Sequence, residues 1–465
     1  LAAKNYKVTL YEKNNYVGGK LAEFSEKGYR FDMGPSLFTM PEYFEDLFQA
    51  ANRNLKDYLT YKKLDKSCTY FFADGKSFTF YADKNRFLKE AREQLSLDGQ
   101  PVLDYLKASK KMYEGAGKLF IENSLHKTGT YFSRQALKSL STLLNPINLQ
   151  SLDFRNRQKL KAAKWIQLFN RYATYNGSSP YKTPAMMAII PHLEHNIGTF
   201  FPEQGMYGLI KAMEDLAIEL KVDIQKGQEV SQLLYSDHRI SAVKVNNKTI
   251  TADVFISNMD IALVYKKLLR DSVKYEEEQV KERSSSGLVF YWGIKKTFPE
   301  LALHNIIFSE NYKKEFTSIF EYLELPADPT IYINISSKEA PQDAPDNCEN
   351  WFVMINTPAG VDISKSQIKE VRNTIVKTIN KHLNTEITQL IEVERQLTPQ
   401  DINKRTLSMA GALYGTASNS ALSSFKRHSN FSNQYNNLFF VGGTVHPGGG
   451  IPLCLNSAKI VASQL

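Results

Sequence analysis

Hydrophobic and polar positions along the chain follow two spacings, one typical of strands and one typical of helices. Short apolar runs bounded by polar or turn residues predict strands over 7–12, 28–32, 222–224, 230–235, 240–245, 249–257, 287–294, 331–336, 351–356 and 438–441. Apolar residues at helical spacing predict helices over 206–220 and 368–383, and residues 86–200 read as mainly helical. This alternation predicts an α/β protein, and 465 residues are enough for two or three domains.

The C-terminal segment 437–465 joins an apolar strand to a helix through a loop that is rich in glycine. The glycines of this loop are Gly442, Gly443, Gly448, Gly449 and Gly450. The helix is predicted to begin at Pro452. A loop without side chains and a helix N-terminus let a flat polar cofactor lie on backbone N–H groups, and the helix dipole there favours negative charge. An ordinary tight turn is the alternative interpretation.

The N-terminal segment has complementary features. The strand KVTLYE ends at Glu12, and in dinucleotide-binding folds an acid at such a strand end accepts hydrogen bonds from the ribose hydroxyls. A solvated surface acid is the other interpretation of Glu12. Gly18, Gly19 and Lys20 follow, and the strand GYRFD then leads into the turn of Met33, Gly34, Pro35 and Ser36.

Six stretches in this order resemble one known family over nearly the whole chain. They are VTLYEKNNYVGGKL, GYRFDMGPS, RYATYNGSSPYKTPAMMAIIPHLE, FPEQGMYGLIKAM, DVFISNMD and VGGTVHPGGGIP. Together they resemble the FAD-dependent carotenoid desaturases of the bacterial phytoene-desaturase type. Within that family, HPGGGIPL and RYATYNGSSPY are most similar to the branch that desaturates hydroxylated carotenoid ends, the hydroxycarotenoid 3,4-desaturases.

The resemblance implies an α/β fold with a Rossmann-like FAD-binding domain of the flavin amine oxidase superfamily, built from 1–65, 201–272 and 405–465. It also implies a mixed-sheet substrate domain (66–85 and 273–404) and a helical, membrane-facing region (86–200). The implied FAD contacts are Glu12, Gly18, Gly19, Lys20, Gly34, Pro35, Ser36, Val230, Gly442, Gly443, Gly450, Ile451 and Pro452. Tyr172, Tyr175 and Tyr181 are predicted either to line the carotenoid tunnel or to belong to the core.

One feature departs from the family pattern. The family carries a G-x-G-x-x-G loop for the FAD diphosphate about 20 residues before the ribose-binding acid. Glu12 has only eleven residues before it, so this loop would lie upstream of Leu1. We therefore expect this form to hold FAD weakly or not at all, and the biological protein with the upstream segment to bind it.

Desaturation removes a hydride and a proton from neighbouring carbons, so most of the chemistry belongs to the flavin. His446 and Glu194 are the candidate catalytic residues, with a structural hydrogen bond and a salt-bridged acid as the respective alternatives. No Ser-His-Asp pattern and no H-E-x-x-H motif appears, and Cys68, Cys348 and Cys454 lack metal-binding spacing, so no metal site is predicted. The electron acceptor is either oxygen or a membrane quinone.

The net charge of +9 permits several partners. No stacking motif or arginine-rich tract supports nucleic-acid binding, whereas a basic protein with an apolar substrate suits an anionic membrane surface. No run of 18 apolar residues is present, which predicts a cytoplasmic protein bound peripherally to the membrane. The docking elements would be the amphipathic stretch 137–145 and the basic and aromatic stretch 155–169, unless the latter is a solvated helix face over a core stripe.

Other activities remain open at this stage. Phytoene desaturation, carotenoid isomerisation and carotenoid saturation belong to the same superfamily. A non-catalytic carrier of prenyl lipids is a hypothesis of a different class, which flavin absorbance would separate from the enzymes. The oligomeric state is not predicted.

Overall fold

The computed structural model describes the whole chain except residues 133–135, 137–138, 140–145 and 421–426. Its largest sheet is mixed and has seven strands, in an order that brings residues 66–81 next to residues 286–397. The strands across this sheet are β17 (Ile391–Leu397), β13 (Ser286–Ile294), β16 (Glu349–Thr357), β15 (Ile331–Asn334), β14 (His304–Ile307), β5 (Lys66–Phe71) and β6 (Ser77–Tyr81).

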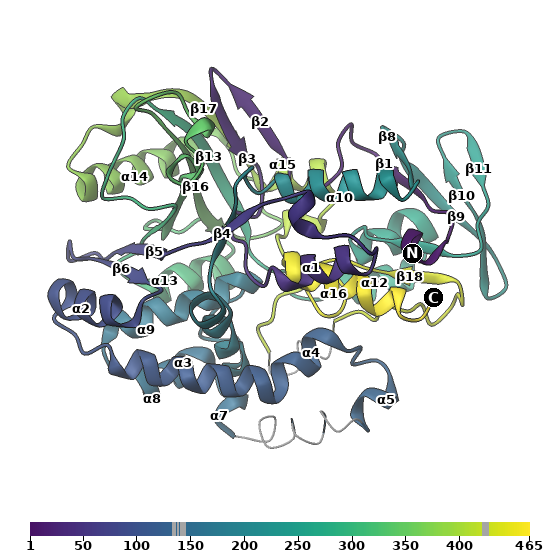
Figure 1. Cartoon of the computed structure of the whole chain (residues 1–465), viewed down its shortest axis with the longest axis horizontal. Helices are drawn as coiled ribbons and strands as arrows, with labels where there is room; N and C mark the ends of the chain where they lie inside the picture. Colours follow the sequence, from purple (N-terminus) through teal and green to yellow (C-terminus); the bar gives the residue numbers. More distant parts are fainter. Residues whose placement is uncertain (133–135, 137–138, 140–145, 421–426) are drawn as a thin grey trace.

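The two faces of this sheet have different partners because side chains alternate along each strand. On one face, Phe290 and Trp292 of β13 pack against Ile375 and Ile379 of α14 (Lys365–Leu383), which Figure 1 shows along one side of the sheet. Helix α14 begins with a capping box at Ser364. The other face, which includes Val289, packs against β2 (Glu23–Glu26) and β3 (Tyr29–Asp32).

Two pairs of parallel strands lie in a second region, at the right of Figure 1 together with both chain termini. Strand β1 (Thr9–Glu12) pairs with β8 (Asp223–Lys226), and β12 (Phe255–Ser257) pairs with β18 (Leu438–Phe440). The accompanying elements are α10 (Gly208–Glu219), α16 (Ile451–Ala462) and the antiparallel sheet of β9 (Val230–Ser236), β10 (Arg239–Val245) and β11 (Lys248–Ile250). These elements confirm the α/β fold class, although the single strand predicted over 249–257 was wrong. The chain breaks there because β11 pairs with β10 whereas β12 pairs with β18.

The described residues between 84 and 170 are mainly helical, in agreement with the prediction for 86–200, and lie below the sheet in Figure 1. The helices of this region are α2 (Lys84–Leu95), α3 (Gln100–Met112), α4 (Lys118–Glu122), α5 (Thr128–Tyr131), α7 (Pro146–Leu149), α8 (Leu152–Leu160) and α9 (Ala163–Asn170). Trp165, Leu168 and Phe169 are buried in the core, and the guanidinium of Arg155 is buried and donates to Asn148 Oδ1 (3.0 Å).

Of the two interpretations of 155–169, the burial of these apolar side chains supports the solvated helix face over a core stripe. The other predicted docking stretch, 137–145, lies outside the described residues except for Ser139. Within the described part of the chain, no helix combines the length and the apolar composition needed to cross a bilayer.

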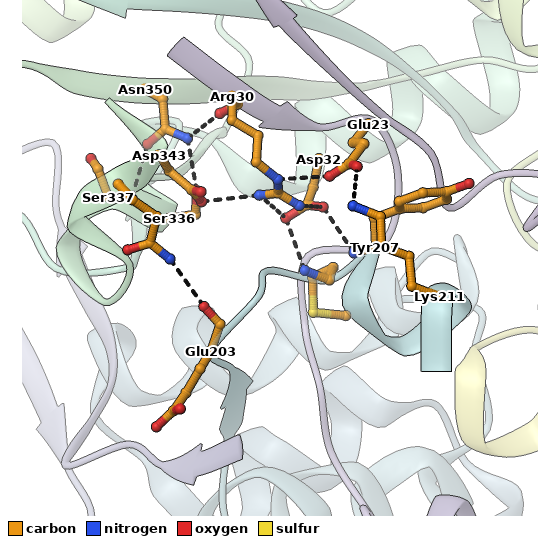
Figure 2. Close-up of polar contacts among 12 residues, drawn as sticks. Glu23, Arg30, Asp32, Glu203, Tyr207, Lys211, Ser336, Ser337, Asp343 and Asn350 are labelled. Atoms are coloured by element: carbon orange, nitrogen blue, oxygen red, sulfur yellow. Dashed lines mark hydrogen bonds and ion pairs between the residues drawn. The ribbon is translucent and has the colours of Figure 1, made fainter. Parts of the chain in front are cut away.

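A polar network joins the hairpin of β2 and β3 to the second region (Figure 2). The Arg30 guanidinium forms ion pairs with Glu23 (2.7 Å), Asp32 (2.7 Å) and Asp343 (3.0 Å). The Asp32 carboxylate also accepts the backbone N–H groups of Met206 and Tyr207 (3.0 Å each), just before α10. The network thus holds the end of β3, where the turn 33–36 begins.

Candidate active site

One large cavity, of about 1900 Å³, extends from the parallel strand pairs to the seven-stranded sheet. Its walls come from segments that are far apart in the sequence. At one end they are residues 6–14, 17–21, 228–230 and 250–260, in the middle 33–37 and 449–455, and at the other end residues from β14, β15, β16 and the segment 171–194. A cavity of this shape can hold a dinucleotide and an elongated apolar molecule together.

All thirteen residues predicted to contact the cofactor lie on the wall of this cavity. They are Glu12, Gly18, Gly19, Lys20, Gly34, Pro35, Ser36, Val230, Gly442, Gly443, Gly450, Ile451 and Pro452. The carboxylate of Glu12 stands at the carboxyl end of β1, and its Oε1 accepts the N–H of Asn14 (2.8 Å). Because the carboxyl ends of parallel strands form the ligand edge in open α/β sheets, this placement suits contact with a ribose.

The glycine-rich loop has the backbone geometry that a close ligand requires. Gly442 (φ +100°) and Gly450 (φ +111°) adopt conformations that L side chains rarely take. A Cβ at Gly450 would meet no atom within 4 Å, so the backbone borders open space there. Helix α16 begins at Ile451, and its first N–H groups lie at the same place. These features fit a flat, electron-rich ring such as a flavin.

Lys20 adds a positive charge to the same wall. Its ammonium is buried and donates to the carbonyl of Ala412 (3.2 Å). Burial lowers the pKa of Lys20 to about 8, although nearby Asp260 opposes this shift. The ammonium therefore stays largely protonated at neutral pH and favours an anionic group in the cavity.

Glu194 lies on the cavity wall but is fully engaged. It forms a buried ion pair with Arg171 (2.9 Å) and accepts a hydrogen bond from the hydroxyl of Tyr175. Burial opposes the charge on Glu194, but Arg171 holds the pKa of its carboxyl below the usual range. A carboxylate held in this way is a structural counter-ion and has little capacity to accept a proton.

Only one of the three predicted tunnel tyrosines lines the cavity. Tyr175 does so, whereas Tyr172 and Tyr181 do not. Tyr172 is completely buried, and its hydroxyl contacts His195. Tyr181 packs edge-on against Phe316. These two positions correspond to the core interpretation that the sequence left open.

His446 lines the cavity and is tied to the helical region. Its Nε2 donates to the carbonyl of Asn123 (2.8 Å), and burial lowers its pKa to about 4, so the ring is neutral. This bond connects the glycine-rich loop with the end of α4. A positioning role for His446 therefore explains the geometry without an acid–base step.

Several cavity residues were missed by the sequence analysis, chiefly His304, Tyr332, Phe352 and Met354. A signal existed in β15, where Tyr332 alternates with the buried Ile331 and Ile333. Such alternation marks the face opposite α14. Among the described residues, no cluster of His, Cys, Asp or Glu side chains is arranged to hold a metal ion.

The whole chain, residues 1–465, matches the family of flavin-containing amine oxidoreductases. The chain belongs to this family. Membership in the flavin-containing amine oxidoreductases makes the protein an FAD-dependent oxidoreductase. It confirms the predicted superfamily and cofactor.

Curated relatives match over the full chain. The 1-hydroxycarotenoid 3,4-desaturase of Flavobacterium sp. (strain P99-3) is 48% identical over 100% of this chain and 95% of that protein. The 4,4'-diapolycopene oxygenase of Methylomonas sp is 33% identical over 100% of this chain and 94% of that protein.

Solved structures share the fold at low sequence identity. An oxidoreductase from Methanosarcina mazei has a TM-score of 0.62 at 14% identity and covers 99% of this chain and 96% of that chain. Cyclohexylamine oxidase from Brevibacterium oxydans has a TM-score of 0.59 at 11% identity, covering 99% of this chain and 95% of that chain.

Gly450→Ala is expected to lower the affinity for FAD by about tenfold. The new methyl group would enter the open space beside the loop, and a side chain at φ +111° is strained. Titration of FAD fluorescence would measure the change. Gly75→Ala is the matched control, because Gly75 also has a positive φ (+83°) with no atom within 4 Å of a Cβ but is absent from the cavity wall. Equal loss of affinity in both variants would contradict the expected role of Gly450.

Proposed function

We propose that the protein is an FAD-dependent carotenoid desaturase that introduces the 3,4 double bond into a 1-hydroxylated acyclic or monocyclic carotenoid. The observation that carries this proposal is the 48% identity, over the full chain, to a 1-hydroxycarotenoid 3,4-desaturase. The cavity supports it, since its wall is largely apolar and its volume of about 1900 Å³ is large.

The reaction removes a hydride and a proton from neighbouring carbons and leaves a carbon–carbon double bond. When bound, FAD supplies the two-electron chemistry by accepting the hydride. Ile306, Phe352 and Met354 form an apolar wall that binds the polyene and excludes water from the reacting carbons. The glycine-rich loop and the N-terminus of α16 favour the negative charge that a reduced flavin carries.

Oxidation of a terminal carbon to an oxygenated group is a second candidate. It rests on the relatives at 33% and 31% identity that are named 4,4'-diapolycopene oxygenase and 4,4'-diaponeurosporene oxygenase. The higher identity to the 3,4-desaturase favours desaturation.

The test is to incubate the protein, in the presence of excess FAD, with liposomes that carry a 1-hydroxylated acyclic carotenoid, and separately with liposomes that carry phytoene. A red shift of the polyene absorption, with loss of two hydrogen atoms by mass spectrometry, is expected for the hydroxylated carotenoid. Gain of oxygen would favour the oxygenase, and a red shift for phytoene alone would favour phytoene desaturation. Bound flavin without a red shift would favour isomerisation or saturation.

We also propose that the protein binds the membrane surface peripherally, beside α4 and α5. Phe132 and Tyr131 are exposed there (86% and 49%), and Leu125 and Ile121, close by in the sequence, line the cavity. A carotenoid dissolved in a bilayer could then enter the cavity without crossing water. The net charge of +9 favours anionic lipid.

Phe132→Ser is expected to reduce binding to anionic liposomes at least tenfold, because transfer of one phenylalanine side chain into lipid contributes about 1.5–3 kcal/mol. Co-sedimentation with phosphatidylglycerol vesicles would measure it. Val280→Ser, which changes a valine of similar exposure (84%) at the end of α12 (Ser272–Gln279), is the control. Equal binding by Phe132→Ser and wild type would reject this surface.

A further inference from the structure

A chain of three hydrogen-bonded side chains lies on the cavity wall, next to the turn that is predicted to contact the flavin. Ser36 Oγ is 2.7 Å from Tyr332 Oη, and Tyr332 Oη is 2.8 Å from His304 Nδ1. All three residues line the cavity. Ser36 and Tyr332 are partly accessible, whereas His304 is buried.

The direction of hydrogen-bond donation along these three side chains follows from the contact between His304 and Asn334. Asn334 Nδ2 contacts the carbonyl of Leu303 (3.2 Å), which can only accept, so this atom is the amide nitrogen. The same nitrogen lies 3.2 Å from His304 Nδ1, and it can only donate there. Nδ1 is therefore assigned as the unprotonated nitrogen of His304, with its lone pair shared between Asn334 Nδ2 and Tyr332 Oη, and the ring proton is assigned to Nε2, which has no hydrogen-bond partner among the described residues.

The remaining two protons are then assigned in turn. Tyr332 donates its hydroxyl proton to His304 Nδ1, because that nitrogen only accepts. Having one proton, Tyr332 can only accept from Ser36, so the hydroxyl of Ser36 donates to Tyr332 Oη. Ser36 Oγ keeps its lone pairs, and no donor among the described residues contacts them. The cavity thus presents a hydrogen-bond acceptor at Ser36 that cannot also donate.

We propose that Ser36 Oγ accepts a hydrogen bond from the hydroxyl group of the substrate, and that Tyr332 and His304 make the protein selective for a hydroxylated end. This inference rests on the proposed function and identifies residues that determine its substrate specificity. A hydroxyl can donate to Ser36, whereas a methoxy or keto oxygen cannot.

The surroundings and the position of Ser36 agree with this role. Ile306, Phe352 and Met354 line the same end of the cavity, and a polyene chain needs no polar partner there. Ser36 itself belongs, with Gly34 and Pro35, to the turn that is predicted to contact the flavin. A hydroxyl on carbon 1 lies only two bonds along the chain from carbon 3, so a hydroxyl site beside the flavin would place the 3,4 bond within reach of the reaction.

The test compares wild-type protein with Ser36→Ala and Tyr332→Phe, all FAD-loaded, on a 1-hydroxy carotenoid and its 1-methoxy analogue. Equilibrium binding is followed by polyene absorbance and turnover by the red shift. Ser36→Ala is expected to weaken binding and kcat/KM for the hydroxylated ligand about tenfold more than for the methoxy analogue, and any loss through an altered flavin contact cancels in this ratio because it affects both ligands equally. Tyr332→Phe releases the proton of Ser36 to donate, so the preference for hydroxyl over methoxy should fall.

Tyr312→Phe is the matched control, because Tyr312 lines the same cavity outside this chain of hydrogen bonds, and it should keep the wild-type preference. Equal losses for both ligands, or an unchanged preference in both Ser36→Ala and Tyr332→Phe, would overturn the assignment. If wild type desaturates no carotenoid, the proposed function fails. If it desaturates the hydroxylated carotenoid while the variants keep its preference, only this inference fails.

Discussion

Replacing Arg171 with methionine is expected to lower the free energy of unfolding by about 3–5 kcal/mol. The side chain of Glu194 is only 2% exposed, and Arg171 is its principal counter-charge. The guanidinium also lies over the rings of Tyr70, Tyr172 and Tyr175. Methionine keeps much of the packing but leaves a buried carboxylate without its cation. Chemical denaturation at pH 7 would measure the loss.

The loss should depend on pH in a defined direction. In the wild type the pKa of Glu194 lies below its ordinary value of 4.5, so its contribution to stability is present above that value and is lost as the pH falls through the lowered pKa. In the variant without Arg171, burial raises the pKa of Glu194. The buried, unpaired carboxylate then destabilises the fold at pH values above its ordinary pKa, and protonation of the carboxylate relieves this destabilisation. The difference between wild type and variant should therefore shrink as the pH falls toward 4.

A matched control is Lys107→Met, which breaks the exposed pair of Lys107 and Asp104. Exposed pairs contribute little, so this change should cost far less than Arg171→Met. If Arg171→Met were no more destabilising than Lys107→Met, or if its cost did not fall at acid pH, the buried ion pair would not have the role described.

Arg30→Met is expected to destabilise the protein by about 3 kcal/mol and to weaken FAD binding. The change leaves Asp343 and Asp32 buried (2% and 7% exposed side chains) without the cation that now separates them (Figure 2). The effect on FAD follows because the turn of residues 33–36, which includes Gly34, Pro35 and Ser36, begins directly after Asp32. Thermal unfolding and FAD titration would measure the two effects.

Arg53→Met serves as the control for Arg30→Met, since Arg53 pairs with Glu219 where both side chains are about 40% exposed. Little change in stability and none in FAD affinity is expected for this control. Unchanged FAD affinity in Arg30→Met would show that the network supports the fold without positioning the turn.

Much of the cofactor site could be predicted from local sequence. Glu12 depends on its place at the end of a strand, and the glycines before α16 depend on a positive φ and on a helix N-terminus. Nearby residues encode each of these local features. Their common cavity was expected from the family resemblance. The substrate side was predicted less well, because Tyr172, Tyr175 and Tyr181 have similar local patterns, and only long-range packing places Tyr175 on the cavity wall.

The stretch 155–169 illustrates the same limit. Basic residues beside Trp165 and Phe169 are equally typical of a membrane-docking helix and of a helix over a core. In the structure, this stretch packs against β6 and α2 and belongs to the core, because Trp165 contacts Phe78 and Phe87. No local sequence pattern encodes these contacts.

The sequence by itself determined the α/β class, because side-chain periodicity is set by neighbouring residues. Its resemblance to a known family gave the flavoprotein family and the segments that are predicted to contact the cofactor. Only the tertiary structure decided that Arg171 neutralises Glu194, that Arg30 secures the turn at Ser36, and that Ser36, Tyr332 and His304 form one directed chain of hydrogen bonds. The partners in each case are separated by 23 to 313 residues, so burial and close packing, which act over the whole fold, bring them together.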